Sequence, residues 1–135
     1  MELVSIITPC YNSAKYIGQM IESIQAQTYK NWELLITDDC STDNSKDVIM
    51  SYAEKDSRVK YFKLLQNSGA GIARNNSIEK AAGRYIAFCD SDDMWKAEKL
   101  EKQIRFMQEN NYEFCHCYTL VVDENNNIVG LNKKL

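Results

Sequence analysis

The sequence predicts an α/β protein with a mostly parallel, Rossmann-like sheet and helices on both faces. Short apolar runs of strand length alternate with longer segments in which apolar residues recur every three to four positions. The short runs lack alternating polar residues, which is typical of strands buried on both faces. Turn-forming and acidic residues follow several of these runs directly, where strands would end.

Composition indicates one globular domain that does not bind nucleic acid. The chain of 135 residues is long enough to bury a core, so we expect a single domain over residues 1–135. Its net charge of −3 leaves no basic excess to neutralise phosphates of nucleic acid. No apolar run approaches the roughly 20 residues of a membrane span, and no signal peptide is recognisable. Five cysteines without paired spacing are typical of a reducing compartment, so we expect a cytoplasmic protein.

The first half of the chain supplies three predicted strands and two helices. Residues 3–8 form the first strand, which is expected to end at Pro9, the single proline. A helix with one apolar stripe follows, capped by Asn12 or Ser13 and ending near Thr28. The remaining elements of this half are a strand over 32–37, a helix from about residue 44 and a strand over 59–65.

The second half continues the alternation of strands and helices. Gly83 separates a helix over 71–82 from a strand over 85–89, which we expect to be buried on both faces. Further predicted elements are a helix over 96–110, a strand over 113–122, a polar turn over 123–127 and a returning strand from residue 128. The last five residues complete no element, so we expect a piece of a longer protein.

Polar residues gather where three predicted strands end. The carboxyl ends of parallel strands lie at one edge of a sheet, where ligands bind. The helix that begins near Gly69 would add backbone N–H groups and Arg74, which favour an anion. Carboxylates in close sequence repel each other unless a cation lies between them, so a metal-bound diphosphate is expected there. The residues expected to converge are Thr8, Pro9 and Tyr11, then Asp38 and Asp39, then Asp90, Ser91 and Asp92.

Each of these interpretations has a structural alternative. An acidic cluster after a strand can be a solvated turn, and acids before a helix can cap it. Capping accounts well for Asp43 but less well for Asp39, which lies several residues before the helix. Cys115, His116 and Cys117 suggest a metal site, but on a strand His116 would face away from both cysteines. We therefore interpret these three residues as strand packing.

Five segments together resemble the nucleotide-binding part of the family 2 glycosyltransferases, which have the GT-A fold. They follow one another in the order found in the family and cover nearly the whole chain, which is far more specific than an isolated Asp-x-Asp motif. The segments are VSIITPCYN at 4–12, SIQAQTY at 23–29, WELLITDDCSTD at 32–43, NSG with ARN within 67–75, and GRYI with DSDD within 83–93.

The resemblance implies how the nucleoside would be held. Asp39 would accept a hydrogen bond from the base, usually uracil, and Pro9 with Tyr11 would form the wall around it. Arg74 would lie near the base or the phosphates. Gly69, at the start of a helix, belongs to the same nucleotide-binding set.

The resemblance also implies a divalent metal at the acidic cluster. Asp92 would bind Mn²⁺ or Mg²⁺ bridging the diphosphate, and Asp90 would lie near both the ribose and the metal. Ser91, between these two acids, is counted with the nucleotide-binding residues. The metal would stabilise the diphosphate as its bond to the sugar breaks.

The activity implied is inverting transfer of a sugar from a nucleotide-diphosphate sugar, expected to be a UDP-sugar. The acceptor would be a saccharide or a lipid-linked saccharide in surface-polysaccharide or glycolipid synthesis. The full-length protein would then work in the cytoplasm or peripherally at the inner face of the membrane.

Inverting transfer needs a general base, and the family's base comes from a later segment near the acceptor site. We therefore expect the chain to end before its acceptor-binding part. Asp123 and Glu124 are interpreted as turn residues, and Asp93 is the one local candidate for the base. The alternative function is a nucleotide-sugar-binding fragment without transfer activity. A phosphoacceptor receiver domain fits less well, because of the acids after the second and fourth strands.

Overall fold

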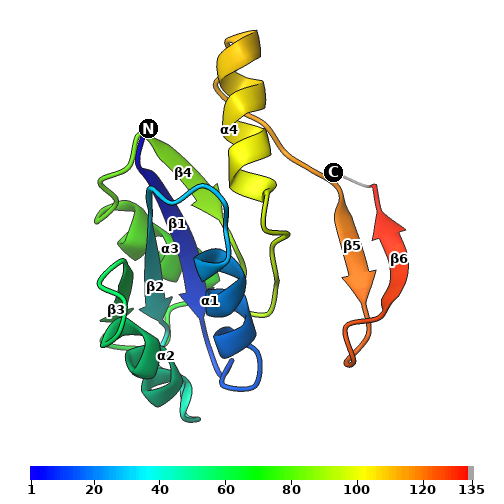
Figure 1. Ribbon diagram of the computed structural model, residues 1–135. Helices are drawn as coiled ribbons and strands as arrows, with labels where there is room; N and C mark the ends of the chain where they lie inside the picture. The colour runs from blue at the N-terminus through cyan, green and yellow to red at the C-terminus, as the bar shows by residue number, and fades with distance from the viewer. Residues whose placement is uncertain (134–135) are drawn as a thin grey trace. The chain divides into compact units, whose positions relative to one another are not determined.

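A four-stranded parallel sheet organises the first part of the protein (Figure 1). The structure is a computed structural model that describes residues 1–133. It divides into two compact units, Met1–Leu100 and Glu101–Leu135, which are described separately. The strand order in the first unit is β3-β2-β1-β4. Its strands are β1 (Val4–Cys10), β2 (Trp32–Asp38), β3 (Val59–Lys63) and β4 (Tyr85–Phe88).

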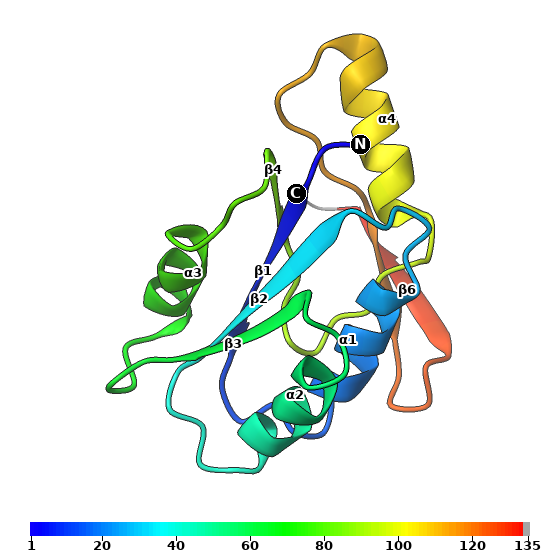
Figure 2. The same cartoon turned by 60° about the vertical axis from the view of Figure 1, so that its left-hand side comes forward.

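Three helices connect these strands and cover both faces of the sheet. They are α1 (Ile17–Gln25), α2 (Ser45–Ala53) and α3 (Ala70–Ile78). From β1 to β3 the chain crosses the sheet in one direction, and it then returns past β1 to form β4. Because parallel crossovers are right-handed, this reversal puts α3 on the face opposite α1 and α2, as Figure 2 shows. The predicted sheet with helices on both faces is confirmed.

Burial is concentrated in the two central strands. All seven residues of β2 are buried, and so are six of the seven in β1. The predicted apolar stripe of α1 is confirmed as Ile17, Met20, Ile21 and Ile24, all buried. The prediction that the strand over 85–89 is buried on both faces is wrong, because Ile86 is 41% exposed and Phe88 is 58% exposed. Among the described strands β4 pairs with β1 alone, so it lies at an edge of the sheet.

The first strand does not end at Pro9 as predicted, because it continues to Cys10. The carbonyl of Ile7 accepts a hydrogen bond from Cys89 N, so the main-chain polar groups of residue 7 point toward β4. Pro9, two positions further on, faces the same side. The pairing of β1 with β4 ends at Ile7 and Phe88, so the N–H that proline lacks is not needed in the ladder there.

Helix α1 begins later than predicted, at Ile17, and is not capped by the side chain of Asn12 or Ser13. Asn12 instead has a positive φ of 49°, a conformation that asparagine adopts more readily than most residues. The main-chain carbonyl of Ser13 accepts hydrogen bonds from the N–H groups of Tyr16 and Ile17. Both side chains are therefore available for hydrogen bonds to the neighbouring loops.

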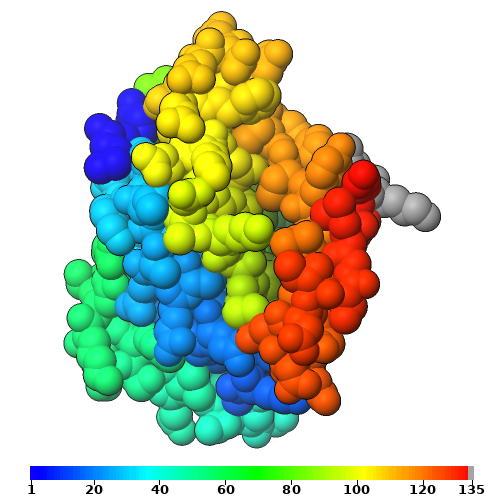
Figure 3. All heavy atoms as spheres, turned by 45° about the vertical axis from the view of Figure 1, so that its right-hand side comes forward, coloured from blue at the N-terminus to red at the C-terminus, as the bar shows by residue number. Residues whose placement is uncertain are grey.

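The segment that follows β4 runs beside α1. Figure 3 shows this segment in yellow-green against α1 in blue. Trp95 N donates to Ser23 Oγ at 3.1 Å, and Thr28 N donates to the carbonyl of Ala97 at 2.8 Å. Gln27, which is fully buried, also accepts a hydrogen bond from Leu100 N through Oε1. These bonds hold the segment on the first unit.

The second unit consists of most of α4 (Lys99–Asn110) and an antiparallel hairpin of β5 (Thr119–Val122) and β6 (Ile128–Asn132). The predicted polar turn is confirmed, since Asp123 N donates to the carbonyl of Asn127. The predicted strand over 113–122 is too long: residues 113–118 form no strand. The strand argument made for Cys115, His116 and Cys117 therefore does not hold.

Within residues 1–133 no helix combines the length and apolar character needed to cross a membrane. All five cysteines are free thiols, and the two that lie at the ends of β1 and β4 are buried.

Candidate functional site

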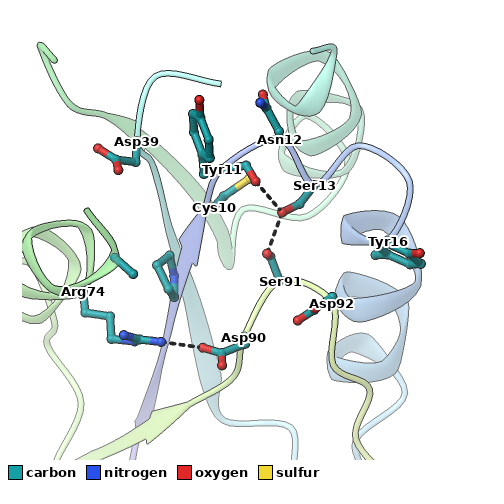
Figure 4. A pocket seen from close by; sticks show the side chains of 12 residues that line it. Cys10, Tyr11, Asn12, Ser13, Tyr16, Asp39, Arg74, Asp90, Ser91 and Asp92 are labelled. Carbon is teal, nitrogen blue, oxygen red and sulfur yellow. Dashed lines mark hydrogen bonds and ion pairs between the residues drawn. The ribbon is translucent and has the colours of Figure 1, made fainter. Parts of the chain in front are cut away.

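A pocket of about 370 Å³ lies at the carboxyl edge of the sheet in the first unit. It sits where the chain order reverses, between the ends of β1 and β4, which is the usual ligand position in open α/β sheets. Four segments line it, and Figure 4 shows their side chains. The lining residues are Pro9 to Ser13 and Tyr16, then Asp39, then Ala70 and Arg74, then Asp90 to Asp92.

Most of the residues predicted from the strand ends do meet in this pocket. Thr8, Asp38 and Gly69 are not among the lining residues. Asp38 is 2% exposed and accepts hydrogen bonds from Tyr61 Oη at 2.8 Å and from Ser41 N at 2.8 Å. Burial and the adjacent Asp38 carboxylate raise the pKa of Tyr61 well above its usual value, so this hydroxyl stays a donor. Asp38 therefore orders the loop after β2.

Asp39 fastens the loop that leads into α3. Its Oδ1 accepts a hydrogen bond from Ser68 N at 2.6 Å, and its Oδ2 accepts one from Gly69 N at 2.8 Å. Gly69 has a φ of +92°, a backbone conformation that favours glycine. The side chain of Asp39 lines the pocket although the residue is only 4% exposed. Each carboxylate oxygen keeps one acceptor position, because a carboxylate offers about four.

Arg74, on α3, and Asp90, after β4, form an ion pair across the pocket. The Arg74 Nη2 to Asp90 Oδ1 distance is 2.8 Å. The two side chains are 36% and 54% exposed, so water screens the pair and its contribution to stability is small. The same exposure leaves both groups accessible to a ligand. A guanidinium at this position can bind phosphate oxygens in a bidentate manner.

Three carboxylates crowd the turn that follows β4. Asp93 N donates to the carbonyl of Asp90 at 3.1 Å, which closes the turn. Partial desolvation, together with the negative charges of Asp92 and Asp90, raises the pKa of Asp93 above its usual range. Asp93 lines a second pocket with Arg74, Phe88 and Asp90, so the two residues of the ion pair belong to both pockets. The turn thus concentrates negative charge beside Arg74.

The acidic turn can supply a divalent cation with part of its ligands. Within residues 1–133 no three His, Cys, Asp or Glu side chains form a group that could hold a metal ion by themselves. Asp90 and Asp92 offer hard oxygen donors on one turn and line the same pocket. Mg²⁺ is commonly held by one or two carboxylates together with substrate phosphates and water, so the residues fit an ion that arrives with a diphosphate.

The loops after β1 and β2 are joined through Asn12, which was predicted only as a helix cap. Asn12 Oδ1 accepts hydrogen bonds from Thr42 N at 2.8 Å and from Asp43 N at 3.3 Å. Asn12 N donates to Ser41 Oγ at 2.9 Å. The N-cap residue of α2 is Asn44 rather than Asp43, but Asp43 Oδ1 accepts a hydrogen bond from Ser45 N and its Oδ2 accepts one from Ala14 N. The pocket wall carrying Tyr11 is therefore anchored to the next loop.

Ser13 is a second residue that was not predicted for the pocket. Its hydroxyl lies 2.6 Å from that of Ser91, in the acidic turn. Ser91 was predicted among the nucleotide-binding residues, and its hydroxyl is directed at Ser13 (Figure 4). No pattern in the sequence links two serines 78 positions apart.

The sequence of the chain matches the model of a known protein family. The model described as Glycosyl transferase family 2 matches residues 5–134. The chain belongs to this family. Known relatives in the family include TuaG of Bacillus subtilis, a glycosyltransferase assigned provisionally by its name to teichuronic acid biosynthesis. TuaG is 49% identical over 112 residues, which are 83% of this chain and 44% of TuaG.

A second family 2 relative has a more specific name. WfgD of Escherichia coli is named as a UDP-Glc:alpha-D-GlcNAc-diphosphoundecaprenol beta-1,3-glucosyltransferase. It is 46% identical over 128 residues, which are 95% of this chain and 49% of WfgD. The chain thus spans about half the length of these relatives.

Solved structures share the fold and contain ligands. The crystal structure of S. aureus TarS in complex with UDP matches with a TM-score of 0.76 at 35% identity, covering 82% of this chain and 33% of TarS. The mannosyltransferase PcManGT from Pyrobaculum calidifontis, in complex with GDP-Man and Mn²⁺, matches with a TM-score of 0.72 at 25% identity. It covers 77% of this chain and 32% of PcManGT. The family 2 chain therefore has the α/β fold of GT-A glycosyltransferases.

Proposed function

We propose that this chain is the donor-binding part of an inverting glycosyltransferase that takes its sugar from a UDP-sugar. The pocket carries this proposal, because it gathers an acceptor for a base, a guanidinium and two carboxylates at the ligand edge of a family 2 chain. The complex of TarS with UDP and the UDP-Glc donor in the name of WfgD support the choice of nucleotide.

The two ends of the pocket suit the two ends of a nucleoside diphosphate. Figure 4 shows Asp39 well separated from Asp92, with Tyr11 and Arg74 on separate lining segments. Tyr11 is 52% exposed, so its ring is available to cover a base. Asp39 would accept the imide N–H of uracil through an oxygen position that the backbone does not use. Pro9 would complete the wall of the base site.

The diphosphate would lie at the other end of the pocket, between Arg74 and the acidic turn. A divalent ion, Mn²⁺ or Mg²⁺, would be held there by Asp92 and Asp90 and would neutralise charge on the leaving diphosphate. Arg74 would bind phosphate oxygens in place of part of its present pairing with Asp90. The complex of PcManGT with GDP-Man and Mn²⁺ supports the use of a divalent metal. The backbone N–H groups at the start of α3 add partial positive charge.

The proposed setting is cell-surface polysaccharide or glycolipid synthesis on the cytoplasmic side of the membrane. The names of TuaG and WfgD, one a teichuronic acid enzyme and the other acting on a diphosphoundecaprenol acceptor, support this setting. Free thiols in all five cysteines accord with a reducing compartment. The acceptor would be a saccharide or a lipid-linked saccharide.

A second candidate is a donor-binding fragment without transfer activity of its own. Two of the carboxylates that line the pocket are already engaged, Asp39 by backbone N–H groups and Asp90 by Arg74. Asp93 has a raised pKa and lies beside the ion pair, which makes it the first residue to test as a base.

The proposed function is tested with the full-length protein and radiolabelled donors. Membranes and extracted lipids that contain the acceptor are supplied with UDP-, GDP- and CDP-sugars, each with Mn²⁺ and with chelator. We expect label from a UDP-sugar to enter product only with the metal, and NMR of the product to show an inverted anomeric centre. Incorporation from GDP- or CDP-sugars alone would overturn the choice of nucleotide, and retention of configuration would overturn inversion.

A further inference from the structure

A hydrogen bond between two serines ties the acidic turn to the loop after β1. The Ser13 Oγ to Ser91 Oγ distance is 2.6 Å, and Ser13 is only 8% exposed. Ser91 lies between Asp90 and Asp92, the two carboxylates proposed to hold the metal. The bond therefore restrains the turn that carries the proposed metal ligands, although neither hydroxyl is a proposed metal ligand.

The neighbours of Ser13 favour one direction for this bond. Ser13 Oγ also lies 3.2 Å from the carbonyl oxygen of Tyr11, which can only accept. A serine hydroxyl has one proton, so both contacts are satisfied when Ser13 donates to Tyr11 and accepts from Ser91. The proton of Ser91 is then committed to Ser13 rather than offered to a phosphate.

Ser13 is itself held rigidly by its main chain. Ser13 N donates to Ser45 Oγ at 2.9 Å, and Ser45 is fully buried at the start of α2. Ser45 Oγ in turn donates to Asp43 Oδ1 at 2.6 Å. A continuous chain of hydrogen bonds thus runs from Asp43 through Ser45 and Ser13 to Ser91. It connects the acidic turn to a helix on one face of the sheet.

The acidic turn needs such a connection because its charges repel one another. Asp90, Asp92 and Asp93 lie within four positions of the chain, so their negative charges repel one another. The ion pair of Asp90 with Arg74 also restrains the turn, but a phosphate or a cation competes for both partners. The Ser13–Ser91 bond carries no charge, so it can persist before and after a ligand binds.

We propose that Ser13 is a positioning residue for the metal site. By accepting a hydrogen bond from Ser91 it restrains the turn that carries Asp90 and Asp92, the two carboxylates that would hold the cation. Ser13 thereby sets the affinity for the cation without contacting it. This inference rests on the proposed function, because it assumes that the acidic turn binds a metal together with UDP.

The test measures how UDP binding depends on Mn²⁺ in the 135-residue chain. The variants are Ser13→Ala, Ser91→Ala and the double variant. Ser51→Ala is the matched control, because Ser51 is exposed and its hydroxyl bonds only within α2, to the carbonyl of Val48. UDP affinity is determined by calorimetry over a series of Mn²⁺ concentrations and in chelator.

We expect each single variant to raise the Mn²⁺ concentration for half-maximal effect by about 3- to 10-fold, the usual range for one neutral hydrogen bond. The double variant should be no worse than the worse single variant, because both remove the same bond. For Ser13→Ala, UDP affinity in chelator should stay as in the wild type, which a collapse of the pocket would not allow. Ser91→Thr keeps the hydroxyl and should restore most of the Mn²⁺ response.

Wild-type Mn²⁺ dependence in Ser13→Ala would overturn the inference, as would single-variant effects that multiply in the double variant. A thermal unfolding curve for each variant separates misfolding from mispositioning, and Ser91→Ala, at a less buried site, carries the test should Ser13→Ala fail to fold. A wild-type chain whose UDP affinity ignores Mn²⁺ would overturn both the metal part of the proposed function and this inference. A metal-dependent wild type with unaffected variants would overturn the inference alone.

Discussion

Asp39 combines two tasks in one carboxylate. It binds the N–H groups of Ser68 and Gly69 with its two oxygens, at 2.6 and 2.8 Å, and so shapes the loop before α3. The same oxygens face the pocket and keep free acceptor positions. Removing this side chain should therefore lower the affinity for every nucleotide. It should also reduce the preference for one base over another.

The first prediction concerns this preference. A carboxylate accepts the imide N–H of uracil, whereas cytosine presents an acceptor at that position, so UDP should bind more tightly than CDP by about 1 kcal/mol or more. Asp39→Ala should weaken both nucleotides, because Ser68 and Gly69 lose their acceptor, and the difference between them should shrink. Competition titrations with UDP and CDP measure both effects.

Asp47→Asn serves as the control for Asp39→Ala, because Asp47 is exposed in the first turn of α2 and does not line the pocket. It should leave both affinities unchanged. Equal binding of UDP and CDP by the wild type would remove uracil recognition from Asp39.

At the scale of elements, the connection from α3 to β4 is fixed by a buried carboxylate. Glu33 Oε1 accepts hydrogen bonds from Ser5 Oγ at 2.6 Å and Ala82 N at 2.8 Å, and Oε2 pairs with Lys60 Nζ at 2.7 Å. Burial acts to raise the pKa of Glu33, but the hydrogen bonds from Lys60 and Ser5 outweigh it, so the pKa lies below its usual value. The turn at Gly83 is thereby pressed against β1.

The second prediction uses the close approach at Gly83. A Cβ there would lie 2.6 Å from Ser5 N and 2.9 Å from the carbonyl oxygen of Leu3, both main-chain atoms that cannot turn away. Gly83→Ala should therefore lower the free energy of unfolding by about 1–3 kcal/mol. Gly71→Ala is the matched control. Gly71 lies in helix α3, and a Cβ added there would meet nothing within 4 Å.

Gly71→Ala should raise the free energy of unfolding by about 0.5–1 kcal/mol, because alanine is the better helix former. Urea unfolding of both variants provides the measurement. Equal stability of Gly83→Ala and the wild type would contradict the packing of this turn.

The third prediction concerns the turn between α2 and β3. Hydrogen bonds from Arg58 lower the pKa of Asp56 to about 2. The Arg58 guanidinium carbon Cζ also lies 3.8 Å from the centroid of the Trp32 ring. Because the folded-state pKa is below the unfolded value, the stabilisation is complete above about pH 4 and is lost as the pH falls toward 2. Arg58 is 38% exposed, so we expect a loss of only about 1 kcal/mol.

Urea unfolding at about pH 6 and about pH 3 tests this, with Asp56→Asn as the comparison. The variant should be less stable than the wild type at the higher pH and should approach it at the lower pH. A difference that is the same at both values would show that ionisation of Asp56 does not contribute.

At the scale of the whole molecule, the sequence predicts most of the sheet and part of the site. The buried apolar runs identified β1 and β2, the strand ends pointed to Asp39, Asp90 and Asp92, and the start of the helix near Gly69 pointed to Arg74. These predictions succeed because main-chain periodicity and sheet geometry are local or general properties. The exposure of β4 could not be predicted, since it depends on strand order. The Ser13–Ser91 bond could not be predicted either, because it depends on a contact between distant segments.

The fourth prediction is that the 135-residue chain binds the donor but does not transfer its sugar to an acceptor. Inverting transfer needs a carboxylate within hydrogen-bond reach of the acceptor hydroxyl. Of the carboxylates in the two pockets, Asp39 is assigned to the base and Asp90 and Asp92 to the diphosphate, which leaves Asp93. The chain also spans only about half the length of its relatives.

Incubation with UDP-sugars and a panel of saccharide acceptors, followed by mass spectrometry, should show slow release of free sugar at most. A glycosylated product well above the rate of hydrolysis would contradict the prediction. Loss of that product in Asp93→Asn would then identify Asp93 as the base.

The most direct test of the account is calorimetric titration of the chain with UDP, in Mn²⁺ and in chelator, for the wild type and Asp92→Asn. The variant keeps the size of the side chain but removes one negative charge and a hard oxygen ligand. We expect one UDP site whose affinity rises with Mn²⁺ in the wild type, and a Mn²⁺ effect about tenfold smaller or more in Asp92→Asn. Asp47→Asn should behave as the wild type. Absence of UDP binding, or identical Mn²⁺ dependence in Asp92→Asn and the wild type, would contradict the account.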